Sequence, residues 1–167
     1  MDDKFKHLNE FYKLYKETSK RDKFTIHSEE YIKNLIEIFE QDKNAQIKLI
    51  IAFYNNIIIS GIIVGIYKEK AVYLYGASSK KYRNLMPNYA VQFKAIQILK
   101  KLGIKEYDFL GIPPIANKNT PYLVFLLLKQ DLEEISFTEL DAMILFTKIL
   151  FIRFMQILKN SDTFITK

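Results

Sequence analysis

The residues that could do chemistry lie in one polar loop at residues 76–89 and at the carboxylate Asp108. The loop reads GASSKKYRNLMPNY, and its candidate substrate-binding residues are Ser78, Ser79, Tyr82, Arg83, Asn88 and Tyr89. Hydroxyl and guanidinium groups can hold phosphate or carboxylate oxygens. Asp108 follows a predicted strand, where it could be a base, an orienting group or a buried, hydrogen-bonded carboxylate. The sequence identifies no catalytic residue among them.

Each loop candidate also has an ordinary structural interpretation. Arg83 could form an ion pair with a nearby acid instead of binding a ligand. Tyr82 and Tyr89 could pack at the edge of the core rather than line a channel. Ser78 and Ser79 stand where a strand is expected to end, and serine there often caps the turn. The sequence leaves both interpretations open.

Composition excludes several kinds of site. The chain has no cysteine, which removes disulfides, thiolate catalysis and cysteine-based zinc sites. Its two histidines, His7 and His27, fall in a region of predicted helix and are too few for a histidine-rich metal site. None of the patterns GxGxxG, GxxxxGKS/T, HExxH or GxSxG occurs. We therefore expect no metal and no nucleotide cofactor.

The charge is positive and unevenly spread. The formal net charge is +6; residues 1–118 carry 20 basic and 13 acidic residues, whereas residues 119–167 carry 5 and 6. A basic body favours anionic partners, although a lysine-rich soluble surface would look the same. The apolar runs at 57–67 and 122–128 are shorter than the roughly 20 residues that a membrane span needs. We expect no transmembrane segment.

The hydrophobic pattern predicts a mixed α/β (α+β) fold. The expected elements are helices at 4–18 and from Ser28 to about residue 39, a polar link at 18–22 between them, strands at 47–54, 57–67 and 71–75, a helix at 87–102 and a strand at 105–110. Asn55-Asn56 predicts a tight turn, Pro87 a helix start and Gly103 a helix end. Three antiparallel strands followed by a crossover helix and another strand give a mixed sheet with helices on both faces.

This order of elements is similar to the acyl-CoA N-acetyltransferase fold. In that fold, the loop before the crossover helix is rich in glycine, so that its backbone N–H groups can hold a pyrophosphate. Here the loop has no glycine after Gly76. The fold is therefore expected, but binding of coenzyme A is not.

Three stretches resemble the Fem-type aminoacyl transferases: FYKLYKETSKRDKFTIHSEEY, YLYGASSKKYRNLMPNYAVQFKAI and KEYDFLGIPP, within residues 5–119. The resemblance implies two tandem acetyltransferase-like domains, of which this chain supplies the second at residues 1–119. It implies transfer of an amino acid from aminoacyl-tRNA, the co-substrate, to an amine on the peptide stem of a lipid-linked or nucleotide-linked muramyl peptide. The product would be the peptidoglycan bridge. A cytoplasmic location is implied, with the inner face of the membrane as an alternative.

The same resemblance implies that the precursor cleft uses both domains, so we expect this chain to be inactive alone. Two other interpretations remain. The chain could be an ordinary acyl-CoA-dependent N-acetyltransferase, or a non-catalytic module that docks on a separately encoded first domain.

The resemblance stops at Asn119, and all five glycines lie between Gly61 and Gly111. Residues 120–144 read TPYLVFLLLKQDLEEISFTELDAMI, where the family pattern has HP, a KTGFGG-like loop and further glycines. Codons that this segment permits, read in a shifted frame, give HPIFGLSIVKTGFGGNIFHRIGCYD. We therefore expect residues 120–167 to be an aberrant segment and 120–144 to be encoded out of frame. The alternative is a lineage-specific insertion, and the nucleotide sequence of the gene decides between them.

Overall fold

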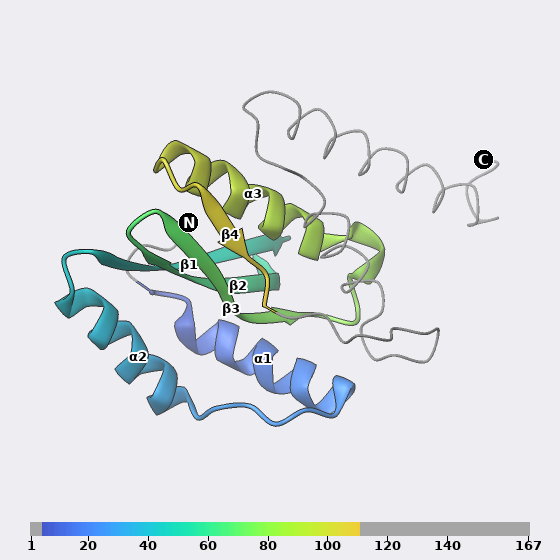
Figure 1. The fold of residues 1–167 in the computed structure, drawn as a ribbon. Coiled ribbons are helices and arrows are strands. Elements are labelled where there is room, and N and C mark those ends of the chain that lie inside the picture. The colour runs from blue at the N-terminus through green and yellow to red at the C-terminus, as the bar shows by residue number, and fades with distance from the viewer. Residues whose placement is uncertain (1–4, 111–167) are drawn as a thin grey trace, which may run out of the picture. The chain divides into compact units, whose positions relative to one another are not determined.

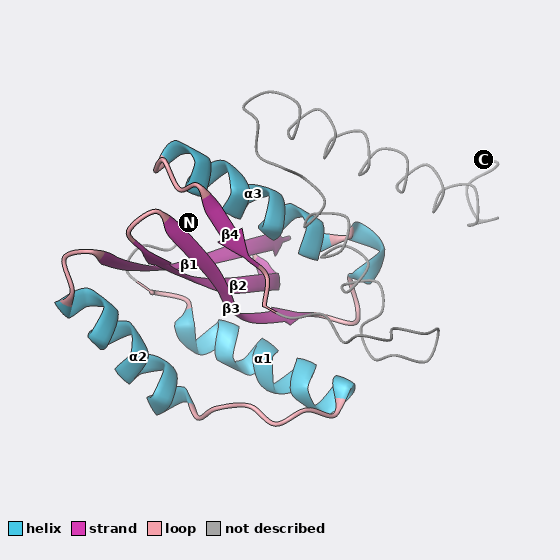
Figure 2. Ribbon diagram, viewed as in Figure 1, coloured by secondary structure: helices cyan, strands magenta, loops and turns pink. Residues whose placement is uncertain are grey.

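Four strands form one mixed sheet in the computed structural model, which describes residues 5–110 (Figures 1 and 2). The elements are α1 (Leu8–Asp22), α2 (Glu29–Gln41), β1 (Ala45–Tyr54), β2 (Ile57–Tyr67), β3 (Lys70–Ser78), the short 3₁₀ helix η1 (Arg83–Leu85), α3 (Pro87–Lys101) and β4 (Glu106–Asp108). The strand order is β1-β2-β3-β4, antiparallel except for the last pair. The predicted boundary at residues 119/120 and the predicted out-of-frame segment lie outside the described residues.

Helices cover both faces of the sheet, as predicted (Figure 2). One core cluster packs α1 and α2 against the sheet, with Phe11, Ile32 and Leu49 fully buried at its centre. The other packs α3 against the opposite face, around Val64 and Ala95. The apolar runs of β2 are buried almost throughout, which explains why this strand reads as a continuous hydrophobic segment.

Local signals place most boundaries correctly. The Ser28 hydroxyl accepts a hydrogen bond from the Tyr31 N–H at 3.1 Å, which confirms the predicted N-cap of α2. Asn55 and Asn56 both have positive φ, 47° and 61°, as the predicted tight turn between β1 and β2 requires. Pro87 begins α3, and Gly103 follows its end with a φ of 73°.

The predicted end of the first helix is wrong. Residues 18–22 form the last turns of α1 instead of a link, and the helix stops where Lys23 turns left-handed, with φ 56°. Thr18 is polar but buried: its hydroxyl donates to the Leu14 carbonyl at 2.8 Å and accepts from the Ser78 N–H of β3 at 3.0 Å. Its polarity therefore marks a contact with the sheet and does not mark a loop.

Two strands also differ in length from the prediction. β3 extends to Ser78, which pairs with Ser60, whereas the pattern predicted an end at residue 75. β4 has only the three residues from Glu106 to Asp108, paired in parallel with Lys70 to Val72. The outer edge of β3 after Val72 therefore has no strand partner among the described residues.

The two ends of the sheet carry different turns and loops. We call the end with the Asn55-Asn56 turn and the loop after β3, residues 79–86, the loop end; in Figure 1 it lies to the right, with the start of α3. The opposite end carries the β2–β3 turn at Lys68 and Glu69, and we call it the Glu69 end. The predicted site residues in the loop all belong to the loop end.

Candidate functional site

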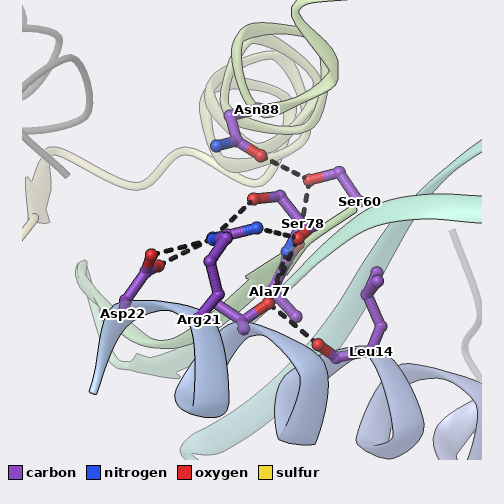
Figure 3. Close-up of polar contacts among 8 residues, drawn as sticks. Leu14, Arg21, Asp22, Ser60, Ala77, Ser78 and Asn88 are labelled. Atoms are coloured by element: carbon purple, nitrogen blue, oxygen red, sulfur yellow. Dashed lines mark hydrogen bonds and ion pairs between the residues drawn. The ribbon is translucent and has the colours of Figure 1, made fainter. Parts of the chain in front are cut away.

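A polar network fixes the last residue of β3 at the loop end (Figure 3). Arg21, in the last turn of α1, donates to the Ser78 carbonyl from Nη1 at 2.6 Å. The same guanidinium donates two hydrogen bonds to the neighbouring Asp22 carboxylate, Nε to Oδ1 at 2.8 Å and Nη2 to Oδ2 at 2.7 Å. Two parallel bonds to a carboxylate hold the guanidinium plane in one orientation. Arg21 is thereby aimed at the strand end.

A second contact from α1 completes the hold on Ser78. The Ser78 N–H donates to the Thr18 hydroxyl oxygen at 3.0 Å, and the Ser78 hydroxyl lies 3.4 Å from Arg21 Nη2. Thr18 and Arg21 are three residues apart, so they share a face of α1. Ser78 is therefore engaged through its N–H, its carbonyl and its hydroxyl, which supports the structural interpretation of this residue.

Electrostatics agree with a structural role for the Arg21–Asp22 pair. The hydrogen bond to Asp22 raises the pKa of the Arg21 guanidinium above its usual value, although partial burial acts in the opposite direction. Both side chains are mostly covered, with 26% and 16% of their areas exposed. A guanidinium and a carboxylate that satisfy each other offer little to a reaction. We assign this pair to positioning the loop.

Asn88, a predicted binding residue, ties the first turn of α3 to the sheet. Its Oδ1 accepts a hydrogen bond at 2.8 Å from the hydroxyl of Ser60, a fully buried residue of β2. The Ser60 oxygen also lies 3.1 Å from the Ala77 carbonyl. Figure 3 shows Asn88 reaching from α3 toward Ser60, so α1 and α3 both attach to the loop end of β2 and β3.

Ser79 caps the turn after β3. Its hydroxyl oxygen accepts from the Lys81 N–H at 3.2 Å, and its own N–H donates to the Ile59 carbonyl at 2.9 Å. The capping interpretation of Ser79 is confirmed. A hydroxyl that accepts still carries its proton, so Ser79 keeps the capacity to donate one bond to a ligand.

Tyr82 and Arg83 face outward in the same loop. The Tyr82 ring is half-buried against Tyr54, with 5.3 Å between ring centroids, and Lys81 Nζ lies 5.1 Å from its centroid. Arg83 is exposed at the start of η1, and no carboxylate within residues 5–110 forms an ion pair with it. The expected ion pair with a nearby acid is therefore not seen within these residues.

The two remaining candidates lie apart from these groups. Tyr89 is only 4% exposed, and this favours packing over lining a channel. Asp108 is exposed and accepts from the Leu110 N–H at 2.7 Å, so its interpretation as a buried carboxylate is wrong. Asp108 pairs with Val72, six residues before Ser78 along β3, or roughly 20 Å. The structure does not bring Asp108 together with the loop.

Arg21 and Asp22 escaped the sequence analysis because both fell in the predicted link. The spacing of Thr18 and Arg21 was the available signal, since it continues the helical face begun by Phe11 and Leu14. Within residues 5–110, no group of three or more His, Asp or Glu side chains could hold a metal ion. Over the same residues, no helix is long and apolar enough to cross a membrane.

Comparison with known proteins decides the family. A model of the FemAB family matches residues 43–127, which include β1 to β4 and the whole loop. The chain belongs to the FemAB family. The resemblance noted from the sequence is thereby confirmed. The match overlaps the start of the segment predicted to be out of frame, and the origin of that segment stays a prediction.

The two curated relatives described next are both named lipid II:glycine glycyltransferase. The lipid II:glycine glycyltransferase of Staphylococcus saprophyticus is 31% identical over 103 residues, 62% of this chain and 25% of that protein. The protein of that name from Staphylococcus haemolyticus is 35% identical over 68 residues, 41% of this chain and 16% of that protein. The match thus spans between 16% and 25% of the length of these two FemAB relatives.

Solved structures agree on the fold. FemX superposes with a TM-score of 0.61 at 19% identity, covering 74% of this chain and 47% of that one. The PaiA N-acetyltransferase of Thermoplasma acidophilum, in complex with coenzyme A, gives 0.54 at 22% identity, covering 75% and 82%. The predicted acetyltransferase-like fold of this FemAB chain is confirmed.

Proposed function

We propose that this chain is one acetyltransferase-like part of an aminoacyl transferase that builds the peptidoglycan bridge. The donor would be aminoacyl-tRNA, and the acceptor an amine on the peptide stem of a cell-wall precursor. The observation that carries the proposal is the FemAB match over residues 43–127, together with relatives named for glycyl transfer to lipid II. We propose the cytoplasmic side of the membrane as the place of reaction.

The described residues offer cationic side chains that can bind an anion, but they offer no clear catalytic base. Aminoacyl transfer needs an amine freed of its proton and a stabilised tetrahedral oxyanion. The loop offers Lys80, Lys81 and Arg83, which are exposed and suited to phosphate oxygens of tRNA or precursor. The carboxylate nearest to them along the network, Asp22, is bound by Arg21. We therefore propose that the chain binds substrate and that a further domain completes the catalytic site.

The proposed binding residues differ in how exposed they are. Arg83, Tyr82 and Ser79 present groups at the surface of the loop, and we place precursor or tRNA contacts there. Ser78 and Asn88 act by holding the loop in position. Tyr89 and Asp108 have weaker support, because one is buried and the other lies along β3 away from the loop.

The acyl-CoA alternative finds less support at the start of α3. A pyrophosphate binds there through backbone N–H groups of the loop and first turn. Pro87, at the first helical position, has no N–H, and the Tyr89 N–H donates to the Met86 carbonyl at 3.1 Å. The space beside Gly76 is also filled, since a Cβ there would collide with the Tyr73 hydroxyl. Few donors remain to cradle a pyrophosphate.

The decisive experiment measures transfer of a labelled amino acid to a lipid-linked muramyl pentapeptide. Glycyl-, alanyl- and seryl-tRNA are tested as donors, first with this chain alone and then with the first domain of a FemAB relative added. We expect no transfer alone, and transfer or tight association when the first domain is present. Transfer by the chain alone would contradict the inactivity that we propose. Copurification with the first domain, without any transfer, would favour a docking module.

A calorimetric titration with acetyl-CoA is the matched control for the rival activity. The proposed function expects no saturable heat, because of the first turn of α3. Saturable binding, followed by acetylation of an amine substrate, would replace the aminoacyl transferase by an N-acetyltransferase. Arg83→Gln sharpens the first assay. It should weaken precursor or tRNA binding without changing the unfolding midpoint, since the Arg83 side chain has no hydrogen bond or ion pair within residues 5–110.

A further inference from the structure

The loop end exposes apolar side chains that the core does not cover. Phe53, Tyr54 and Ile57 flank the Asn55-Asn56 turn and are 51%, 42% and 52% exposed. We call these three residues the hairpin tip. Leu85, in η1, is 44% exposed. Single exposed apolar residues need no explanation, but a cluster of them on one surface does.

The hairpin tip meets the loop through Tyr54, whereas the Phe53 ring lies against His7, with 5.3 Å between ring centroids. The Tyr54 ring contacts the Tyr82 ring at 5.3 Å between centroids. Tyr54 also pairs with Ile57 across the turn, and Leu85 lies one turn of η1 beyond Tyr82. In Figure 1 the end of β1 and the loop before α3 lie at the same side of the sheet. An object that touches the hairpin tip can therefore also touch the loop.

Cationic groups border this apolar surface. Lys80, Lys81 and Arg83 are exposed, and no carboxylate among the described residues pairs with them. Residues 43–105 contain eleven Lys and Arg and one acid, Glu69, although Lys43, Lys68 and Lys101 among them lie toward the Glu69 end. That one acid lies at the other end of the strands, where Lys105 Nζ is 2.9 Å from its carboxylate. Within residues 5–110, the Asp22 carboxylate at this end is bound by Arg21, so the cations of the loop keep their positive charge without an acid partner.

We propose that the loop end binds the surface of an anionic phospholipid bilayer. Cations meet the phosphate groups, tyrosines suit the headgroup region, and aliphatic side chains enter the acyl boundary. An RNA could use the cations and the Tyr54 and Tyr82 rings, but it would leave the aliphatic Ile57 and Leu85 uncovered, whereas a bilayer covers all of these groups. This binding goes beyond the proposed transfer reaction and does not rest on it, since it requires neither tRNA nor a peptide stem.

The test sediments the full chain with phosphatidylcholine vesicles that contain or lack phosphatidylglycerol. Binding should require the anionic lipid and should weaken at high salt, because screening shortens the reach of the cations. Replacing Lys80, Lys81 and Arg83 together by Gln should lower the partition coefficient roughly a hundredfold, at about fivefold for each basic residue. Changing Ile57 and Leu85 to Ser should lower it by roughly tenfold or more, through loss of apolar burial.

A matched variant removes the same charge from the Glu69 end. Lys43→Gln, Lys68→Gln and Lys101→Gln change the net charge equally but lie away from the hairpin tip, so binding should fall less than about threefold at moderate salt. Circular dichroism melts confirm that each variant is folded. Equal losses in the two triple variants would show that net charge alone attracts the vesicle, and would overturn the proposal. So would binding that is insensitive to the loop variant, or binding of tRNA but no vesicle.

Discussion

The two ends of the sheet use similar charged residues in opposite ways. At the Glu69 end, exposed cations pair with exposed acids: Lys70 with Glu106 at 2.7 Å and Lys105 with Glu69 at 2.9 Å. At the loop end, the guanidinium of Arg21 is built into a network on β3, and the loop cations have no acid partner among residues 5–110.

This difference between exposed ion pairs and the Arg21 network shows which polar groups stabilise the fold. Exposed pairs exchange hydration for a contact that water screens, so they contribute little to stability. Arg21 instead bonds the Ser78 carbonyl at the end of a strand, and the Thr18 hydroxyl lies 3.2 Å from the same oxygen. The loop end can thus leave Lys80 and Arg83 unpaired for a ligand, because other residues hold the loop in place.

The largest expected difference between the two ends concerns two glycines of β2. A Cβ at Gly61, toward the loop end, would lie 2.8 Å from Cδ2 of the fully buried Phe11 ring. A Cβ at Gly65, toward the Glu69 end, would lie 3.0 Å from Leu74 Cδ1 and 3.1 Å from Phe39 Cζ, which are ends of partly buried side chains. We expect Gly61→Ala to cost about 3 kcal/mol and Gly65→Ala about 1 kcal/mol.

Urea unfolding of the full chain measures both changes. The pair is matched, since each variant adds one methyl group to the same strand. Equal losses would mean that α1 can move away from β2 as easily as the Phe39 ring can turn. In that case, α1 would not be the rigid support of the loop end.

The second prediction removes the guanidinium that holds Ser78. Arg21→Met keeps the aliphatic part of the side chain but leaves Asp22 mostly covered without its partner and the Ser78 carbonyl without its Arg21 donor. We expect a loss of about 2 kcal/mol in the free energy of unfolding. Lys105→Met, at the Glu69 end, should leave the urea midpoint unchanged.

Hydrogen exchange adds a local measurement to that comparison. In Arg21→Met, amides of the loop after β3 should exchange faster, while amides of β1 and β2 near the Glu69 end keep their protection. Uniform loosening of the whole sheet would contradict the local role that we assign to Arg21.

The elements that sequence predicted well have signals within a few residues of one another. Ser28 caps α2 through Tyr31, and Asn55-Asn56 makes its own turn. The misplaced ends, of α1 and β3, depend on each other: Thr18 and Arg21 meet Ser78, about sixty positions later in the chain. The residues near Thr18 in the sequence do not include Ser78. The polarity of Thr18 therefore predicts a link at residues 18–22 and not a buried helical turn.

The candidate site divides in the same way. Ser79 and Arg83 behave as their loop context indicated, one capping a turn and the other exposed. Asn88 could not be foreseen as a partner of Ser60, nor Asp108 as a neighbour of Val72, because these depend on strand register and on the placement of α3. Register follows from the packing of whole faces.

The third prediction concerns a buried polar pair toward the Glu69 end, where Tyr107 follows Glu106 in β4 and pairs with Ala71. The Tyr107 hydroxyl donates to Gln92 Oε1 at 3.0 Å. Gln92 is fully buried, and its Nε2 has no hydrogen-bond partner among residues 5–110. Tyr107→Phe should cost about 1 kcal/mol, since it leaves the amide oxygen buried without its donor. Adding Gln92→Leu should recover that loss by removing every polar atom of the amide.

Alkaline titration gives an independent measurement on the same pair. Burial raises the pKa of Tyr107 well above its usual value, with the charge of Tyr73 contributing. The neutral phenol is therefore the form that folding favours, and stability is lost only as the pH rises toward the pKa of the folded state. Tyr107→Phe should reduce this alkaline loss, whereas an unchanged alkaline transition would contradict the burial of a neutral phenol.

The smallest expected effect on stability tests the charge pairs of the Glu69 end directly. Glu69→Gln with Glu106→Gln breaks both exposed pairs, and the urea midpoint should not move, because water already solvates the lysines that remain.

The same double variant frees Lys70 and Lys105, so this end gains unpaired cations without gaining a hairpin tip. Vesicle binding should rise by less than about tenfold, since added charge at this end lacks the apolar contacts of the loop end. If the double variant instead restored full binding to the chain that lacks Lys80, Lys81 and Arg83, then unpaired charge alone would make a membrane surface. The contrast between the two ends would then reduce to ion pairing.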